Sequence, residues 1–181
     1  MNIVAPRVAR AFAIWITGLP ASGKSTLTAA LKDLLAGRDI DVEVLESDAL
    51  RRVFTPQPSY DEQERKRFYS QMVFVGEMLT RHGVPVIFDA TANRRAYRDA
   101  ARAEIPRFLE IYMDCPLELC VQRDPKGIYA AGRQGGASTV PGSQEPYEPP
   151  DHPDLVVRCD RESPRAAAQR VLQELIERGY V

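Results

Sequence analysis

The chain has 181 residues, of which 44% are hydrophobic and 27% are charged, and its formal net charge is −1. These values predict a single globular domain over residues 1–181 with a sizeable core. The near-neutral charge excludes recruitment of nucleic acid or a membrane surface by bulk charge, and no apolar run approaches the length of a membrane span. The three cysteines, Cys115, Cys120 and Cys159, lack a disulfide-like spacing, so we expect a reducing, cytoplasmic location.

Predicted strands and helices alternate along the chain. Short apolar runs rich in β-branched and aromatic residues predict strands over 11–17, 42–45, 84–88, 108–113 and 155–157. Apolar spacing and capping residues predict helices around 27–35 and over 61–82, 94–104, 116–123 and 163–178. This alternation predicts an α/β fold with a five-stranded parallel sheet and helices on both of its faces.

Residues 124–153 interrupt this alternation. The segment is rich in proline and glycine and has no helix or strand period, apart from a helical turn expected near Tyr129. Loops of this length in a compact domain are usually functional lids or disordered. We therefore expect a lid loop over residues 124–153.

Residues 18–25 read GLPASGKS and fill every fixed position of the phosphate-binding loop pattern. Gly18 and Gly23 let the backbone bend toward the phosphates of a nucleoside triphosphate, and successive N–H groups point inward. Lys24 is expected to reach the β- and γ-phosphates, and the Ser25 hydroxyl to bind Mg²⁺. A strand before the loop and a helix after it supply the context that this pattern requires.

Two acidic residues, Asp48 and Asp89, follow the second and third predicted strands. Ligands of a parallel sheet bind outside the carboxyl ends of its strands, so both acids are candidate site residues. Asp48, with Arg51 three residues later, is placed either to accept a hydrogen bond from a substrate hydroxyl or to cap a helix. Asp89 either acts on Mg²⁺ or caps the helix that begins near Arg94.

Several arginines are predicted at the mouth of the sheet, where guanidinium groups would stabilise the charge that spreads over a transferring phosphoryl group. About half of them are expected to be ordinary surface residues. The set is Arg65, Arg94, Arg95, Arg98, Arg123 and Arg133. Neither histidine has the spacing of a metal site, and no cysteine–histidine cluster indicates zinc.

Three parts of the chain together resemble a known family. They are residues 18–26 (GLPASGKST) with 46–51 (ESDALR), then Arg65, and then 120–129 (CVQRDPKGIY) followed by 146–155 (PYEPPDHPDL). From about residue 11 to its end, the chain resembles the adenylyl-sulfate kinases, or APS kinases. The resemblance implies a P-loop NTPase fold. It also implies transfer of the γ-phosphate of ATP, with Mg²⁺, to the 3′-hydroxyl of adenylyl sulfate.

The resemblance also implies roles for individual residues. Asp48 would act at the 3′-hydroxyl, and Lys24 would be the second catalytic residue. The expected nucleotide contacts are Gly18, Ala21, Ser22, Gly23, Lys24, Ser25, Thr26 and Arg123. The expected substrate contacts are Arg51, Tyr60, Arg65, Phe68, Arg95 and Lys126. From the phosphate-loop pattern and the strand-end positions, and not from the resemblance alone, the expected Mg²⁺ ligands are Ser25, Asp48 and Asp89. The partner would be a small-molecule nucleotide and not a nucleic acid or a membrane, and a homodimer is allowed.

The chain departs from the family pattern at several positions. Phe68 replaces an asparagine, Val140 stands where a second stacking phenylalanine is usual, Asp89 replaces a small residue, and residues 92–95 (ANRR) replace Ser-Pro-Tyr-Arg. These departures leave open a kinase of the same build that acts on another small-molecule hydroxyl. A nucleotide-binding switch without enzymatic activity is a third interpretation, which the lid and the pair of Asp48 and Arg51 disfavour.

Overall fold

The computed structural model describes residues 11–133 and 140–181. Its elements, in chain order, are β1 (Ala13–Gly18), α1 (Lys24–Ala36), β2 (Glu43–Glu46), α2 (Ser47–Phe54), α3 (Glu62–Arg81), β3 (Val86–Asp89), α4 (Arg95–Glu104), β4 (Phe108–Asp114), α5 (Leu117–Arg123), α6 (Ile128–Arg133), β5 (Leu155–Arg158) and α7 (Pro164–Glu177). None of the helices in these described ranges is long and apolar enough to cross a membrane.

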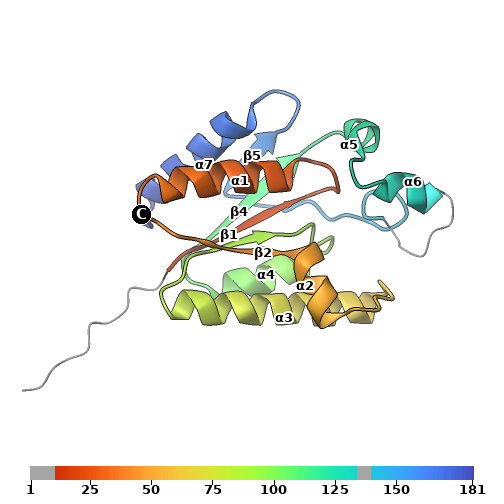
Figure 1. The fold of residues 1–181 in the computed structure, drawn as a ribbon, viewed down its shortest axis with the longest axis horizontal. Coiled ribbons are helices and arrows are strands. Elements are labelled where there is room, and N and C mark those ends of the chain that lie inside the picture. The colour runs from red at the N-terminus through yellow and green to blue at the C-terminus, as the bar shows by residue number, and fades with distance from the viewer. Residues whose placement is uncertain (1–10, 134–139) are drawn as a thin grey trace, which may run out of the picture.

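The five strands form one sheet in the order β2-β3-β1-β4-β5, and every neighbouring pair is parallel. Helices α1 and α7 cover one face of the sheet, while α2, α3 and α4 lie on the other (Figure 1). The predicted α/β fold is therefore confirmed. Because parallel strands share one direction, their carboxyl ends meet at one edge, beyond which α5 and α6 lie (Figure 1).

The core has two halves, one on each side of the sheet, because side chains of a strand alternate between its faces. On β1, Ile14 and Ile16 pack with the buried leucines of α1, whereas Trp15 packs with α3 on the opposite face. Gly76 brings α3 close to the sheet, since a Cβ there would lie 2.1 Å from Cζ of Phe88. The central strands β3, β1 and β4, largely buried on both faces, form a rigid base for the loops at their carboxyl ends.

Local sequence signals explain where several elements begin. Asp61 caps α3 by accepting a hydrogen bond from Glu64 N, and Ser163 caps α7 by accepting one from Ala166 N. β3 begins at Val86, directly after Pro85, whose nitrogen cannot donate to a strand ladder. The sequence analysis mentions the eight-residue helix α2 only through the possibility that Asp48 caps it. The N-cap of α2 is Glu46.

Within the predicted lid, the helical turn expected near Tyr129 is a short helix. The six-residue helix α6 lies where that turn was expected, and residues 134–139 of the predicted lid fall outside the described residues. From Val140 to Asp154 the chain has no helix or strand and runs back along the sheet edge to β5.

Candidate active site

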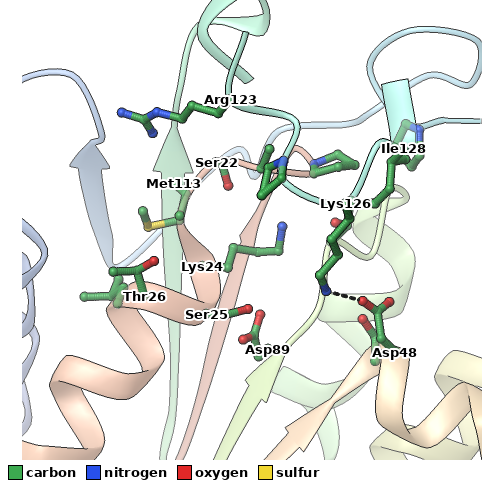
Figure 2. Close-up of a pocket in the computed structure, with 18 of the residues that line it drawn as sticks. Ser22, Lys24, Ser25, Thr26, Asp48, Asp89, Met113, Arg123, Lys126 and Ile128 are labelled. Carbon is green, nitrogen blue, oxygen red and sulfur yellow. Dashed lines mark hydrogen bonds and ion pairs between the residues drawn. The ribbon is translucent and has the colours of Figure 1, made fainter. Parts of the chain in front are cut away.

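A cavity of about 690 Å³ opens at the carboxyl edge of the sheet. Its lining comes from the phosphate loop, the ends of β2, β3 and β4, helix α3 and the lid (Figure 2). Such a volume falls in the usual range for small-molecule sites. The structure brings most of the predicted site residues together here. The predicted residues that do not line the cavity are Gly18, Phe68, Arg94, Arg95, Arg98 and Arg133.

The phosphate loop has the backbone that its glycines predict. Gly18 has φ 150°, and a Cβ there would lie 2.8 Å from both Cβ and O of Met113. Gly23 has φ 97° and is the N-cap of α1, so the first N–H groups of that helix face the cavity without a side-chain cap. The Ser22 hydroxyl is buried without a hydrogen-bond partner among the described residues. The loop thus presents unpaired donors, which suit an anion.

Lys24 folds back onto the loop that precedes it. Its Nζ donates to the carbonyl oxygens of Gly18 at 3.1 Å and Leu19 at 2.9 Å. Burial lowers the pKa of Lys24 from its ordinary value of 10.5 to about 8, and the negative charge of Asp89 is the largest opposing influence. A bound triphosphate would favour the charged ammonium and compete with these carbonyl groups.

Asp89 ends β3 and points toward the Ser25 hydroxyl, below the ammonium of Lys24 (Figure 2). It is only 4% exposed, and its carboxylate forms no hydrogen bond or ion pair with another described residue. The alternative that Asp89 caps α4 is wrong, because the N-cap of that helix is Arg94. A hydroxyl and an unpaired carboxylate are hard oxygen donors, so Ser25 and Asp89 fit Mg²⁺.

Asp48 lies in the first turn of α2 and contacts the lid across the cavity. Lys126 Nζ donates to Asp48 Oδ2 at 2.5 Å and lies 3.8 Å from Glu46 Oε1 (Figure 2). The hydrogen bond to Asp48 raises the pKa of Lys126. The alternative that Asp48 is the helix cap is wrong, since Glu46 holds that position. About half of the Asp48 side chain is exposed, so its carboxylate is accessible from the cavity.

Two nearly buried arginines line the side of the cavity next to α3. Arg51 is 9% exposed, lies 4.0 Å above the ring centroid of Phe68 and pairs with Glu64 at 2.5 Å. Arg65 is 6% exposed, and its Nε donates to the carbonyl oxygen of Tyr60. Phe68 is completely buried, which corrects the prediction that it contacts substrate. Its ring instead supports the guanidinium of Arg51.

Arg123 lies at the other end of the cavity, beside a disulfide that the sequence analysis did not predict. Cys115 and Cys159 are bonded, and Cys120 is the free cysteine among the described residues. Arg123 lies 3.9 Å from Cys115 Sγ and donates to the carbonyl oxygen of Cys159. The expectation of no disulfide is therefore wrong. The two cysteines are far apart in sequence but follow the neighbouring strands β4 and β5, which brings them together.

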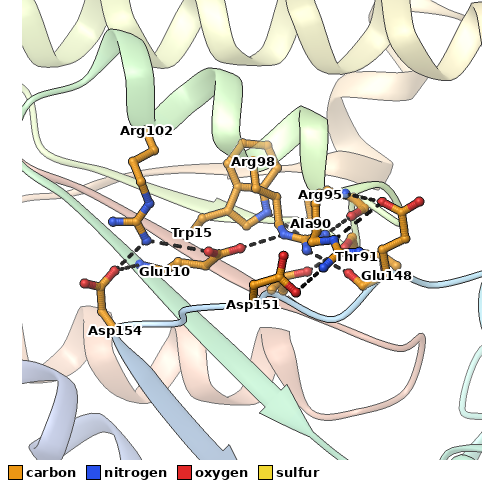
Figure 3. A network of polar contacts seen from close by, with 12 residues as sticks. Trp15, Ala90, Thr91, Arg95, Arg98, Arg102, Glu110, Glu148, Asp151 and Asp154 are labelled. Carbon is orange, nitrogen blue, oxygen red and sulfur yellow. Dashed lines mark hydrogen bonds and ion pairs between the residues drawn. The ribbon is translucent and has the colours of Figure 1, made fainter.

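Arg95 does not reach the cavity. Its side chain pairs with Asp151, and its backbone N–H donates to Glu148 Oε2 at 2.8 Å. Both acids belong to the segment that returns from the lid to β5. The prediction that Arg95 contacts substrate is corrected accordingly, because its charge is satisfied on the outside of that segment (Figure 3).

The cavity also contains residues that the sequence analysis did not single out. Examples are Tyr69, Thr91 and Met113. Thr91 follows Asp89 closely at the end of a strand, so the strand-end argument could have found it. Tyr69 and Met113 looked like ordinary core residues, and only the packing of α3 and β4 reveals that they reach the cavity.

Comparisons with known proteins agree with this geometry. The family model described as adenylylsulphate kinase matches residues 10–158. The adenylyl-sulfate kinase of Synechococcus sp. (strain JA-3-3Ab) is 37% identical over 172 residues, covering 95% of this chain and 98% of the relative. That of Halothermothrix orenii is 33% identical over 168 residues, covering 93% and 91%. The solved APS kinase CysC of Mycobacterium tuberculosis, in complex with AMPPNP and APS, superposes with a TM-score of 0.86 at 30% identity, covering 92% and 98%.

Proposed function

Because the chain belongs to the adenylyl-sulfate kinase family, we propose that it transfers the γ-phosphoryl group of ATP to the 3′-hydroxyl of adenylyl sulfate. The hydroxyl oxygen forms a bond to the γ-phosphorus as the bond from that phosphorus to the β,γ-bridging oxygen breaks. ADP leaves with the electron pair, and Asp48 accepts the hydroxyl proton. The products are ADP and 3′-phosphoadenylyl sulfate.

One observation carries this proposal: a phosphate loop and an accessible carboxylate face each other across one cavity. The loop amides and Lys24 would neutralise the triphosphate, since unpaired N–H groups at a helix N-terminus favour negative charge. Arg123, at the end of the cavity near β5, is placed to contact the nucleotide base. Closure of the lid would exclude water and hold the two reactants together.

The opposite end of the cavity suits an anionic acceptor. Arg51 and Arg65 offer fixed guanidinium groups, and the Tyr60 ring, 5.1 Å from the Arg51 guanidinium, offers a surface for base stacking. Lys126 adds a third cation, which Asp48 holds at the cavity mouth. Two nearly buried cations on one wall would stabilise the phosphosulfate of adenylyl sulfate in particular.

Mg²⁺ would be held by Ser25 and Asp89, with Asp48 at a longer reach across the cavity. When bound, it would neutralise charge on the phosphate oxygens. Asp89 is the better placed of the two acids for this task, because Asp48 already has a partner in Lys126 whereas Asp89 has none among the described residues. The proton-accepting role then remains with Asp48.

The direct test is ADP release with adenylyl sulfate as the only added acceptor. We expect acceptor-dependent ADP release, formation of 3′-phosphoadenylyl sulfate by mass spectrometry, and loss of both in Lys24→Ala. If the wild-type protein binds Mg·ATP but releases no ADP with this acceptor, the acceptor assignment is wrong. A panel of other hydroxyl compounds then tests the alternative acceptor, for which the departures from the family pattern at Phe68, Val140 and residues 92–95 leave room.

We also propose a cytoplasmic location, because the reaction consumes ATP. The cysteine argument no longer supports this location, since Cys115 and Cys159 are paired. Fractionation of cells that express the protein would test it, and recovery of the protein outside the cytoplasmic fraction would contradict it.

A further inference from the structure

Arg98, on α4, is a buried charge outside the cavity. It is 1% exposed, and its Nε donates to Glu110 Oε1 at 2.6 Å (Figure 3). Glu110, on β4, is 5% exposed, and its other oxygen lies 3.5 Å from Arg102. A buried ion pair is costly to desolvate and is weak evidence for stability alone. The contribution of Arg98 must therefore be sought in the other bonds that its guanidinium forms.

The remaining donors of Arg98 hold two separate backbone segments. Nη1 donates to the carbonyl oxygen of Ala92, in the loop 90–94 between β3 and α4. Nη2 donates to the carbonyl oxygen of Glu148 at 2.7 Å, in the segment 145–154 that returns from the lid, which we call the strap. A guanidinium is a planar fork, so these bonds fix the two segments relative to each other.

The loop 90–94 needs such support. Ala92 has φ 43°, in the left-handed region that is unfavourable for a residue other than glycine. Its carbonyl oxygen accepts from Arg98, and its N–H donates to the hydroxyl of Tyr69 at 3.0 Å. Tyr69 lines the cavity, and its ring centroid lies 5.9 Å from the Arg51 guanidinium. Arg98 is thus connected to the acceptor wall through one strained residue.

The loop and the strap also meet the start of the phosphate loop. Thr17, directly before Gly18, donates from Oγ1 to the carbonyl oxygen of Thr91 at 2.6 Å. The hydroxyl of Tyr147, on the strap, lies 3.0 Å from the same Oγ1. Glu148 N donates to the carbonyl oxygen of Asn93 at 2.8 Å, which adds a backbone bond between strap and loop. The strap is therefore bonded both to loop 90–94 and to the residue that precedes the phosphate loop, and the last two segments line the cavity.

We propose that Arg98 is a positioning residue for the acceptor side of the cavity. It holds the loop 90–94 and the strap in one arrangement and thereby fixes Thr91 and Tyr69 at the cavity wall, without touching substrate itself. This inference rests on the proposed function for its kinetic consequence. Its structural consequence, the placement of the loop, does not depend on the identity of the acceptor.

The kinetic test compares Arg98→Lys with Arg102→Lys. A lysine ammonium keeps the charge but lacks the fork, so Arg98→Lys cannot hold Ala92 and Glu148 together with Glu110. We expect the KM for adenylyl sulfate to rise about tenfold while the KM for ATP stays within about twofold. Arg102 also lies on α4 and contacts Glu110, but it meets the strap only at Asp154, next to β5, and it contacts neither loop 90–94 nor Glu148 among the described residues. Equal effects of the two variants on the acceptor KM would overturn the proposal.

The second readout uses Trp15, the one tryptophan of the chain. Its indole N–H donates to the carbonyl oxygen of Ala90 at 3.1 Å, so its fluorescence reports on loop 90–94 without any ligand (Figure 3). We expect a shifted emission in Arg98→Lys and an unchanged emission in Arg102→Lys. Unchanged emission in both variants would overturn the proposal, whatever the activity of the wild-type protein. Inactivity of the wild-type protein with adenylyl sulfate would refute the proposed function and leave this fluorescence test intact.

A variant that keeps the buried pair of Arg98 and Glu110 intact covers the case in which Arg98→Lys does not fold. Tyr147→Phe removes the hydroxyl near Thr17 and keeps the ring, which lies 5.8 Å from the Arg98 guanidinium. We expect a smaller change of the same kind: the KM for adenylyl sulfate rises about threefold, with a shifted Trp15 emission. A folded Tyr147→Phe protein with both properties unchanged would also overturn the proposal.

Discussion

Binding of Mg·ATP at pH 8 should be accompanied by uptake of about half a proton per protein molecule, and Lys24 is the group that takes it up. In the empty site, burial lowers the pKa of Lys24 to about 8, so about half of the ammonium groups are deprotonated at this pH. The negative oxygens of a bound triphosphate raise the pKa of Lys24 again, so the deprotonated half of the Lys24 side chains takes up a proton from solvent. At pH 7 the same reasoning gives an uptake of only about 0.1 proton.

The sign of the pH dependence follows from the direction of the shift. Between about pH 8 and 10.5 the unfolded chain, with an ordinary lysine, binds more protons than the empty folded protein. The contribution of Lys24 to the stability of the empty protein therefore increases as the pH rises through this window. Nucleotide affinity changes in the opposite direction and should fall by up to about tenfold per pH unit above 8, because protonation must accompany binding.

Calorimetric titration of Mg·ATP in two buffers with different ionisation enthalpies measures the uptake directly. At pH 8 the terminal phosphate is already ionised, since its second pKa is about 6, so the nucleotide contributes little. Lys24→Arg should abolish the uptake, because a guanidinium does not titrate. Lys126→Met should retain it, since the hydrogen bond to Asp48 keeps Lys126 protonated in the wild-type protein. An uptake that is absent at pH 8, or that persists in Lys24→Arg, would refute the reasoning.

Two further predictions concern Asp48 and the disulfide. Asp48→Asn should lower kcat by about 10²–10⁴-fold in single-turnover assays and leave the Kd for ATP nearly unchanged, because its partner is Lys126 and not the phosphate loop; a kcat within tenfold of wild type would remove Asp48 from its proposed role. The bond between Cys115 and Cys159 spans 44 residues, which corresponds to about 4 kcal/mol in the chain-entropy model, or roughly 10 °C in Tm for a protein of this size. Reductant should lower the Tm of wild type by this amount but leave Cys159→Ser unchanged, and equal Tm values with and without reductant in wild type would contradict it.

The sequence predicts the sheet and the phosphate loop because both depend on local patterns. Each strand is a short apolar run, and the loop needs residue types at fixed spacing within eight residues. The location of Asp48 and Asp89 at the cavity could also be predicted, since every parallel strand brings its carboxyl end to the same edge of the sheet. The prediction weakened where a helix was short, as in α2, whose eight residues contain Arg51 as their one buried side chain.

Residues whose role depends on distant partners could not be predicted. Arg98 was predicted at the mouth of the sheet with five other arginines, because nothing in its neighbourhood in the sequence reveals that Glu110, Ala92 and Glu148 surround it. The same holds for the pairing of Cys115 with Cys159, which follows from the order of β4 and β5 in the sheet. These contacts join residues that are far apart in the sequence, and local sequence patterns do not predict them.

The two lysines of the cavity share a property that bears on how the site assembles. Lys24 donates to carbonyl oxygens of its own loop, and Lys126 donates to Asp48, so each cation has an internal partner in the structure. An unpaired charge in a cavity of low polarity is costly, and such internal partners remove that cost. A triphosphate would therefore compete with two carbonyl groups for Lys24, whereas the bond from Lys126 engages Oδ2 of Asp48 and leaves Oδ1 available to a substrate hydroxyl. Filling of the phosphate loop would thus reorient Lys24, while Asp48 is already held by Lys126 in a position that faces the cavity.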